Sequence, residues 1–203
     1  MIVERIAIFD EGAKLMIIDI TQELFSSRLY PGDKQAVFER VKTIGDDEYN
    51  LTNISMSVHN GTHVDAPSHF VENGKAIHEL DLSVFYGKCT IVSLDGIIEE
   101  ADITNILETC QKRLLFKGKN ELSESAAELI ARSSVELVGV ESQSVGNEDH
   151  PLPVHMILLK KGVIPLEGLD LSCVMPGEYV LSAFPLNMQG VEGSPVRAVL
   201  IKE

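Results

Sequence analysis

The sequence lacks tryptophan, contains only three cysteines among its 203 residues, and has no long uninterrupted hydrophobic run. Cys89, Cys110 and Cys173 are widely spaced, so they fit neither a disulfide framework nor a CxxC zinc site, and we expect reduced thiols in the core. The longest N-terminal apolar stretches, 6–9 and 15–18, are short and bounded by charged residues. We therefore expect neither a signal peptide nor a membrane-spanning helix, and a cytoplasmic location.

Basic residues are also scarce, because 17 Lys and Arg stand against 31 Asp and Glu, which gives a formal charge of −14. A negative field repels nucleic-acid phosphates and anionic membrane surfaces unless basic residues gather in one place. Lys112-Arg113 and Lys160-Lys161 are isolated pairs, not such a cluster. We expect no nucleic-acid or membrane partner and a small molecule as the ligand. The acidic surplus also favours a bound cation.

The composition, with 44% hydrophobic and 24% charged residues, is that of a globular protein, and the length predicts a single domain over residues 1–203. Short apolar runs rich in β-branched residues predict strands at 15–20, 52–58, 90–94, 113–116, 135–140, 179–184 and 196–201. Helical spacing of apolar residues predicts one helix over 103–110 and another after a capping box at Ser125-x-x-Glu128. Helices in the middle and strands at both ends favour an α/β domain with a mixed sheet.

The runs at 135–140 and 52–58 differ in their pattern. The first is apolar at nearly every position, which predicts a strand covered on both faces. The second alternates apolar and polar residues, which predicts a strand with one open face. If this alternation continues, His59, His63 and Asp65 share the polar face.

Three of the six His fall within the 11 residues from His59 to His69. Residues four apart on a straight strand are separated by about 13 Å, too far for two imidazoles to share an ion, so the backbone must turn between His59 and His63. Gly61 permits this turn because it adopts positive φ without a Cβ clash. Pro67 then stiffens the exit from the turn. The segment predicts a rigid set of metal ligands.

Two imidazoles and a carboxylate suit Zn²⁺ or Mn²⁺ better than Ca²⁺ or Mg²⁺, which prefer oxygen ligands. Such a set leaves a coordination position open for water, whose pKa a metal lowers from about 15.7 to about 7. The pattern therefore predicts hydrolysis. His69 follows Pro67 closely, which leaves open whether it is a ligand, a residue behind the ligands or a general acid and base. We expect His78 and His150 to be ordinary structural residues.

The run His-x-Gly-Thr-His-x-Asp-x-Pro-x-His, complete from His59 to His69, resembles the signature of the metal-dependent cyclase-like hydrolases, the family of bacterial kynurenine formamidases and isatin hydrolases. Supporting segments extend the resemblance over nearly the whole chain: Asp19-Ile20-Thr21, Tyr30-Pro31-Gly32-Asp33, Leu137-Val138-Gly139-Val140, Leu166-Glu167-Gly168-Leu169 and Ser194-Pro195-Val196-Arg197-Ala198. The resemblance implies a single α/β domain of the swivelling β/β/α type, in which helices flank a mixed, partly barrel-like sheet.

The resemblance also implies two divalent ions, Zn²⁺ or Mn²⁺, in each subunit. His59, His63 and Asp65 would bind the first ion, and Asp65 would bridge to the second. His155 would hold the second ion, and Glu167, twelve positions further on, would bridge. Taken alone, Glu167 resembles a turn residue and His155 a core histidine, so only the family pattern points to them.

In the same pattern His69 is the proton donor and acceptor, and the implied reaction is hydrolysis of a small amide, above all an aryl formamide such as N-formylkynurenine. Tyr30 stands where the kynurenine formamidases have Trp, and would bind the substrate with a smaller ring. Glu141 replaces a common Asp, and the loop over 142–153 also departs from the pattern.

These departures leave two alternatives open. The first is a ring hydrolase for isatin-type or lactone substrates, or a true cyclase, using the same metal site. The second, from a different class, is a metal-bound ligand-binding protein without turnover. The presence of His69 favours an enzyme, because a degenerate relative would be expected to lose it before the structural Gly and Pro residues. The family further implies a homodimer or homotetramer, with the Tyr30 loop near a subunit boundary.

Overall fold

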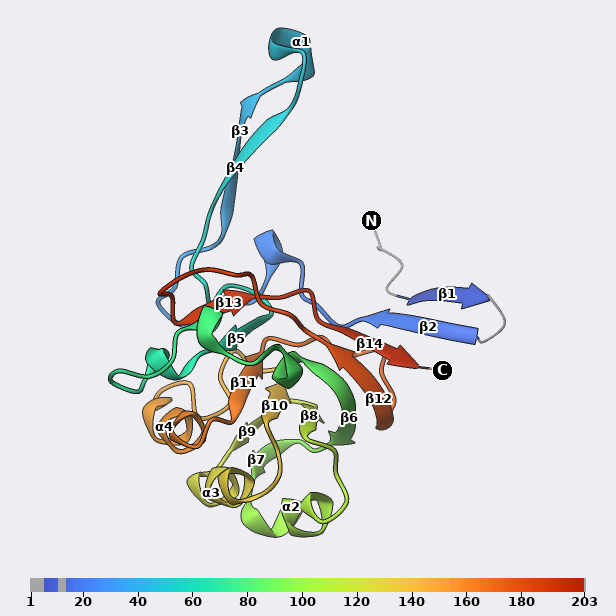
Figure 1. Ribbon diagram of the computed structural model, residues 1–203, viewed down its shortest axis with the longest axis vertical. Helices are drawn as coiled ribbons and strands as arrows, with labels where there is room; N and C mark the ends of the chain where they lie inside the picture. Colours follow the sequence, from blue (N-terminus) through green and yellow to red (C-terminus); the bar gives the residue numbers. More distant parts are fainter. Residues whose placement is uncertain (1–5, 11–13, 203) are drawn as a thin grey trace.

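The computed structural model describes residues 6–10 and 14–202 (Figure 1). Its strands are β1 (Ile6–Asp10), β2 (Lys14–Asp19), β3 (Val37–Lys42), β4 (Leu51–Ser55), β5 (His63–Asp65), β6 (Tyr86–Ser93), β7 (Gly96–Ile98), β8 (Arg113–Lys117), β9 (Asn120–Leu122), β10 (Leu137–Val140), β11 (Ile164–Glu167), β12 (Gly177–Ser182), β13 (Gly193–Pro195) and β14 (Val199–Lys202). Its α-helices are α1 (Ile44–Asp47), α2 (Glu100–Leu107), α3 (Glu124–Arg132) and α4 (Leu152–Lys160). Within these described residues, no helix is long and apolar enough to cross a membrane.

In the described part of the chain, ten strands form one mixed sheet in the order β1-β2-β14-β12-β6-β8-β10-β11-β5-β13. The central strands β6, β8, β10 and β11 are parallel, and the strands on either side of them are antiparallel. Parallel neighbours need crossover connections, which α2, α3 and α4 supply in turn. The predicted mixed α/β fold is therefore confirmed.

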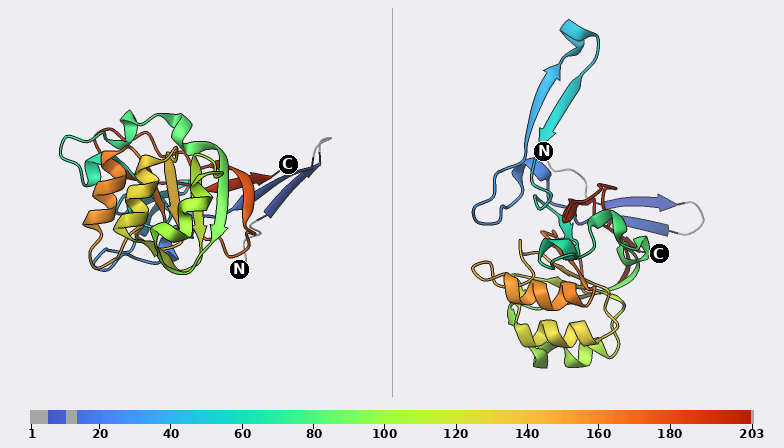
Figure 2. Two further views of the ribbon diagram at one scale, coloured as in Figure 1. Left: turned by 90° about the horizontal axis from the view of Figure 1, so that it is seen from below. Right: turned by 60° about the vertical axis from the view of Figure 1, so that its left-hand side comes forward.

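The two faces of the central sheet bury two different cores. On β8, Leu114 and Phe116 contact the core beneath the helices, whereas Leu115 between them belongs to the core of the other face. Figure 2 shows α2, α3 and α4 stacked on one side of the sheet. β10 is buried at every position, as its apolar sequence predicts. Packing on both faces fixes the strand ends that carry the site.

The hairpin of β3 and β4, with α1 at its tip, projects far from the rest of the molecule (Figure 1), and we call residues 37–55 the arm. β4 is exposed at every position, so the prediction of a strand with one covered face was wrong. Its alternating pattern is real, but the arm extends away from both cores and neither face is covered. The exposed apolar side chains of the arm are Val37, Phe38, Val41, Ile44, Tyr49, Leu51 and Ile54.

Three helices differ from the sequence prediction. Helix α2, which was expected over 103–110, spans Glu100–Leu107, and α3 and α4 differ as follows. The N-cap of α3 is Ser123, whose Oγ accepts a hydrogen bond from the N–H of Ala126 at 3.2 Å, and Ser125 lies inside the first turn. The capping box was therefore placed two residues too late. Helix α4 was not predicted, because apolar residues occur around most of its circumference and leave little helical periodicity.

The three cysteines do not share one environment. Cys89 is buried, Cys110 is half-buried and Cys173 is exposed, and all three are free thiols. The prediction of core thiols is confirmed for Cys89 and wrong for Cys173, which lies in a surface turn between β11 and β12.

Candidate metal centre

The chain turns sharply between the arm and β5, and this turn brings the first candidate ligands together. Gly61 has a φ of +69°, a conformation that costs glycine little. The Asn60 side chain closes the turn by accepting a hydrogen bond from the N–H of Ser57 at 2.8 Å. β5 then places His63 and Asp65 on the same face, as alternation along a strand requires. The predicted turn between the histidines is confirmed.

Glu167 reaches the same site from the neighbouring strand. β11 pairs with β5 in antiparallel register, so that Glu167 lies directly opposite His63. The Nε2 atom of His63 is 3.2 Å from Oε2 of Glu167 and 3.7 Å from Oδ1 of Asp65. Gly168 follows with a φ of +67°, and a Cβ there would clash with the carbonyl oxygen of Gly61. Glycine is therefore required where the two ligand-bearing segments touch.

His155 comes from α4, and its ring is fixed by a backbone group. Its Nδ1–H donates to the carbonyl of Pro151 at 2.8 Å, because a carbonyl oxygen can only accept. Its Nε2 then lies 3.1 Å from Oε1 of Glu167 and 3.4 Å from Oδ2 of Asp65. His63 is held in the same way by the carbonyl of Gly61 at 3.0 Å. Both rings thus turn Nε2 toward the two carboxylates, which is how metal-binding histidines are oriented.

The charges of this cluster are strongly coupled. Burial disfavours a charged His155, but hydrogen bonds with Asp65 and Glu167 raise its pKa to about 10. Burial also acts to raise the pKa of Asp65, yet hydrogen bonds with His155 and His59 hold it well below its usual range. Positive charge is therefore stabilised between the carboxylates. Beyond the 3.4 Å contact with Nε2 of His155, Oδ2 of Asp65 has no hydrogen-bond partner among the described residues. These nitrogen and oxygen donors fit a divalent cation.

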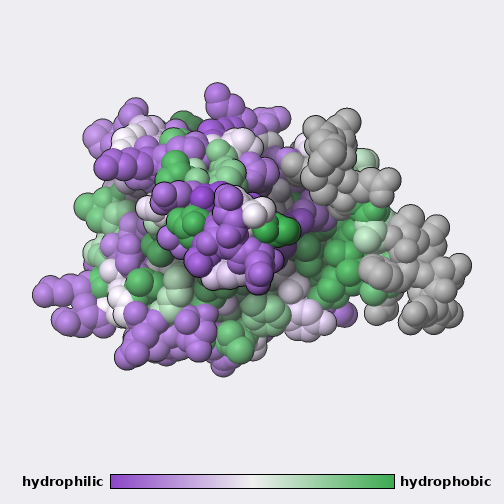
Figure 3. All heavy atoms as spheres, turned by 90° about the horizontal axis from the view of Figure 1, so that it is seen from above, coloured by the Kyte–Doolittle hydropathy of each residue, from purple (hydrophilic) through white to green (hydrophobic). Residues whose placement is uncertain are grey.

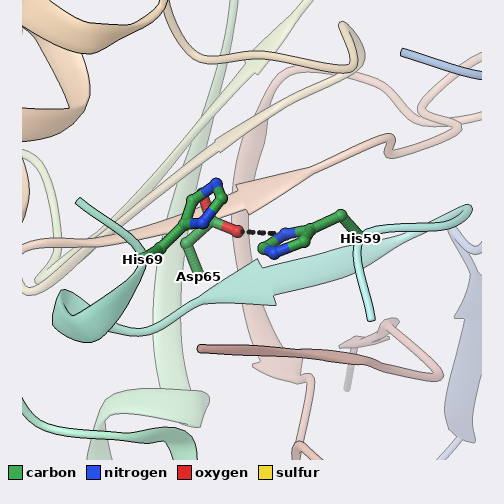
Figure 4. Close-up of side chains that lie close together, drawn as sticks. All are labelled: His59, Asp65 and His69. Carbon is green, nitrogen blue, oxygen red and sulfur yellow. Dashed lines mark hydrogen bonds and ion pairs between the residues drawn. The ribbon is translucent and has the colours of Figure 1, made fainter. Parts of the chain in front are cut away.

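The structure brings the residues into two candidate ligand groups. One consists of His63, Asp65 and Glu167, and the other of His59, Asp65 and His69; in each group the ligand atoms lie within 4.8 Å of one another. Asp65 belongs to both groups, in keeping with a bridging role. His59 Nδ1 lies 2.9 Å from Oδ1 of Asp65 (Figure 4).

His69 lies on the short 3-10 helix Pro67–His69, which follows β5. Its ring stacks on that of His59 with 4.1 Å between centroids. Burial lowers the pKa of His69, so the ring is neutral at pH 7 and accepts a proton. Its position is compatible both with a ligand and with a general acid and base.

These side chains line a cavity of about 230 Å³. Six residues that the sequence pointed to border it, namely Tyr30, His59, His63, His69, His155 and Glu167, together with Asp33, Ser57, Phe70, Gln143, Ser144 and Pro151. The hydroxyl of Tyr30 donates to the carbonyl of Glu148.

Sequence reasoning missed Phe70 and Gln143 as pocket residues. Phe70 directly follows His69, and its ring lies 4.6 Å from that of His155. Gln143 follows the carboxyl end of β10, where binding residues gather in parallel sheets. The loop over 142–153 departs from the family pattern. This departure was the feature of the sequence that could have pointed to Gln143.

Other residues that the sequence raised lie outside the pocket. Glu141 accepts backbone hydrogen bonds from Gly118 at 2.7 Å and Leu171 at 2.8 Å. Its carboxylate therefore anchors two loops, and the replacement of Asp by Glu at this position does not alter the pocket lining. Nδ1 of His78 accepts from the N–H of Gly190 at 3.3 Å, a structural contact as expected.

Comparison with known proteins places this geometry in a family. The profile of the family described as "Putative cyclase" matches residues 18–147. The kynurenine formamidase of Salinibacter ruber is 32% identical over 206 residues, covering 92% of this chain and 97% of the relative. The chain belongs to the cyclase family. The resemblance inferred from the histidine motif is thereby confirmed.

Solved structures agree with the assignment of this chain to the cyclase family. A structure described as a "predicted metal-dependent hydrolase from Bacillus stearothermophilus" superposes with a TM-score of 0.81 at 27% identity, covering 94% of this chain and 100% of that one. Isatin hydrolase A from Labrenzia aggregata superposes with a TM-score of 0.80 at 21% identity, covering 92% and 93%. The second likeness shows the fold alone. The expected cyclase-like fold is confirmed, and the roles of individual residues stay predictions.

Proposed function

We propose that this cyclase-family protein is a metal-dependent hydrolase of a small amide, and that an aryl formamide such as N-formylkynurenine is the substrate class that fits best. The observation that carries the proposal is the buried cluster of His63, Asp65, His155 and Glu167. Three of these residues, His63, His155 and Glu167, line one cavity with the neutral ring of His69. The kynurenine formamidases among the relatives support an amide, and the pocket supports a small one.

Two divalent ions, Zn²⁺ or Mn²⁺, are proposed for each subunit. The first would be held by His59, His63 and Asp65, and the second by Asp65, His155 and Glu167, with the carboxylates shared. Two divalent ions held close together would need such shared carboxylates to offset their repulsion. When bound, the ions supply an acidified water and polarise the substrate carbonyl.

His69 would move the proton. Its neutral ring accepts the proton of the attacking water and returns it to the amine nitrogen. The water oxygen bonds to the carbonyl carbon as the C–N bond breaks, so an aryl formamide gives formate and an aniline. The rings of Tyr30 and Phe70 would contact the aryl group from the cavity wall.

The test is a metal analysis of the purified protein coupled to hydrolysis assays on formanilides, isatin and simple lactones. Metal-dependent turnover of formanilides is the expected result. Turnover of isatin or lactones alone would contradict the formamidase proposal and indicate a ring hydrolase. Ligand binding without turnover of any of these compounds, by a fully metal-loaded protein, would favour the non-catalytic alternative.

A homodimer or homotetramer is proposed as the assembly. The arm supports it, because a two-stranded hairpin is at best marginally stable alone in water and this one exposes apolar side chains. Figure 3 looks onto the arm from above and shows hydrophobic side chains exposed among hydrophilic ones. A monomer in light scattering at working concentration would contradict this. The cytoplasmic location also stays a proposal, which fractionation of the source cells would test.

A further inference from the structure

One buried polar group in the wall of the pocket is not explained by bound metal ions. Gln143 lines the cavity and is only 3% exposed, and its Nε2 atom has no hydrogen-bond partner among the described residues. An amide N–H is a donor and does not bind a cation. Because the atom is buried, bulk water does not pair with it either. An unpaired buried donor is costly, so its missing partner should be an acceptor that enters the pocket.

The backbone on both sides of Gln143 is tied to the strand that carries Glu167. Before it, the carbonyl of Ser142 accepts a hydrogen bond from the N–H of Gly168 at 2.8 Å. After it, the N–H of Val145 donates to Oε1 of Glu167 at 2.7 Å. The loop that follows β10 is therefore fixed to the candidate metal centre, and the position of the Gln143 side chain is set relative to a candidate ligand.

The amide nitrogen of Gln143 lies where the two ligand-bearing segments touch. A Cβ on Gly168 would lie 3.0 Å from this nitrogen and would also clash with the carbonyl oxygen of Gly61. That same carbonyl accepts from Nδ1–H of His63 at 3.0 Å. The unpaired donor is thus close to the backbone that orients His63 and Glu167, at the inner end of the pocket.

The chemistry of the remaining lining leaves this donor available for a carbonyl group. Among the described residues that line the pocket there is no Lys or Arg, so neither an ammonium nor a guanidinium group binds a substrate oxygen there. The hydroxyl of Tyr30 already donates to the carbonyl of Glu148. A substrate carbonyl that reaches the buried cluster would therefore meet the neutral amide of Gln143 beside it.

We propose that Gln143 binds the acyl oxygen of the substrate, with its Nε2–H donating a hydrogen bond to that oxygen. The proposal rests on the proposed function and adds a carbonyl-binding residue to it. As water adds to the carbonyl carbon, the π electron pair of the C=O bond moves onto the oxygen, and it returns when the C–N bond breaks. A donor fixed before the reaction stabilises this developing negative charge. Isatin and lactones carry the same acceptor, so the role of Gln143 does not depend on which of these compounds is hydrolysed.

The experiment compares formanilide with thioformanilide, in which sulfur, a weak acceptor, replaces the acyl oxygen. Both are assayed with the metal-loaded parent and with Gln143→Met, which keeps the length of the side chain and removes the amide. We expect Gln143→Met to lose about 10²-fold in kcat/KM for formanilide, the effect of removing one such donor, and less than about tenfold for thioformanilide. The ratio of the two losses isolates the contact, because other effects of the variant are common to both compounds.

A matched variant and two physical measurements separate this contact from a structural effect. Gln111→Met makes the same replacement at a half-buried position between α2 and β8, outside the pocket, and should leave both rates unchanged. Gln143→Met should keep the metal content and the Tm of the parent. If it does not fold, Gln143→Asn, which withdraws the amide by one methylene, replaces it with the same expected ratio. Equal losses for both compounds, or no loss for formanilide, would overturn the proposal.

Binding measurements distinguish a failure of this proposal from a failure of the proposed function. If the metal-loaded parent hydrolyses neither compound, the formamidase proposal fails, and calorimetry then gives the dissociation constants of both compounds for the parent and for Gln143→Met. Weakening of formanilide binding by about fivefold or more, with little change for thioformanilide, would still support the hydrogen bond from Gln143. Equal dissociation constants for the parent and the variant, or equal weakening for both compounds, would overturn it.

Discussion

His63 and His155 each donate Nδ1–H to a backbone carbonyl, and each thereby turns Nε2 toward Asp65 and Glu167. A ring fixed in this way is a ligand that needs no rearrangement on metal binding. The ring of His69 stacks on that of His59 and, within the part of the chain that the structure describes, is not anchored to a carbonyl in this way. The single-residue roles can therefore be separated by comparing metal content with activity.

His63→Ala should lose both bound metal and hydrolysis, whereas His69→Ala should keep its metal and lose about 10²–10⁴-fold in kcat, the usual contribution of a general acid and base. Metal content by mass spectrometry and steady-state kinetics on a formanilide measure the two effects. His78→Ala, which changes a histidine outside the pocket, is the control. A metal-depleted His63→Ala protein that hydrolyses formanilides as fast as the parent would disprove the mechanism.

The stability of the metal-free protein should depend on pH through the same cluster. The folded-state pKa of His155 is raised from 6.5 to about 10. Its contribution to the free energy of unfolding is therefore fully present below pH 6.5 and is lost as pH rises toward 10. Asp65 has the opposite sign, since its lowered pKa contributes stability that is lost only in acid. Between pH 6.5 and 9.5 we therefore expect the Tm of the chelated protein to fall.

A His155→Gln variant, measured by the same thermal scans, should show a flatter profile over this range. Metal binding should become stronger as pH rises, because the cation replaces the protons of the histidines. A parent protein whose metal-free Tm is constant or rises from pH 6.5 to 9.5 would contradict the assignment of this charge to the cluster.

At the scale of elements, the sequence predicted those strands whose environment is set by their own pattern. The buried β10 and the middle of β8, Leu114–Phe116, were found because a strand covered on both faces is apolar at successive positions. The arm was not predicted, because alternation of apolar and polar residues is equally typical of a strand that packs on a core. Whether the apolar face of such a strand is covered depends on the tertiary structure or on a second subunit, and not on the pattern of the strand itself.

The arm should act as an assembly element. Phe38 and Ile54 are opposite each other on β3 and β4, and their side chains are 56% and 57% exposed. Phe38→Asp and Ile54→Asp should each shift the protein toward a monomer in light scattering, because a buried, unpaired carboxylate is costly at an interface. Ile97→Asp, which charges an equally exposed position (59%) on β7, should leave the assembly unchanged. Identical masses for all variants and the parent would exclude the arm from the interface.

At the scale of the whole molecule, the local and distant parts of the site differed in how well the sequence predicted them. His59, His63 and Asp65 lie within a few residues of one another, so their spacing alone indicated a metal site. His155 and Glu167 join them only through the pairing of β11 with β5 and the packing of α4. Such contacts are set by the fold, which explains why only the family pattern pointed to these two residues.

Because the candidate ligands come from a turn, two strands and a helix, bound metal should stabilise the entire fold and not one segment. A ligand that binds only the folded state at 100 times its Kd adds about 2.7 kcal/mol to the free energy of unfolding. For a chain of this size, that corresponds to a rise in Tm of about 5–10 °C. Thermal scans of the chelated protein, before and after addition of Zn²⁺ or Mn²⁺, measure it. His63→Ala should show little of this rise, and Mg²⁺ should produce less than Zn²⁺, because imidazole donors disfavour it. If the two transition metals leave the parent's Tm unchanged at saturating concentration, these ligand segments are not joined by a metal, and the cluster is held by its own hydrogen bonds alone.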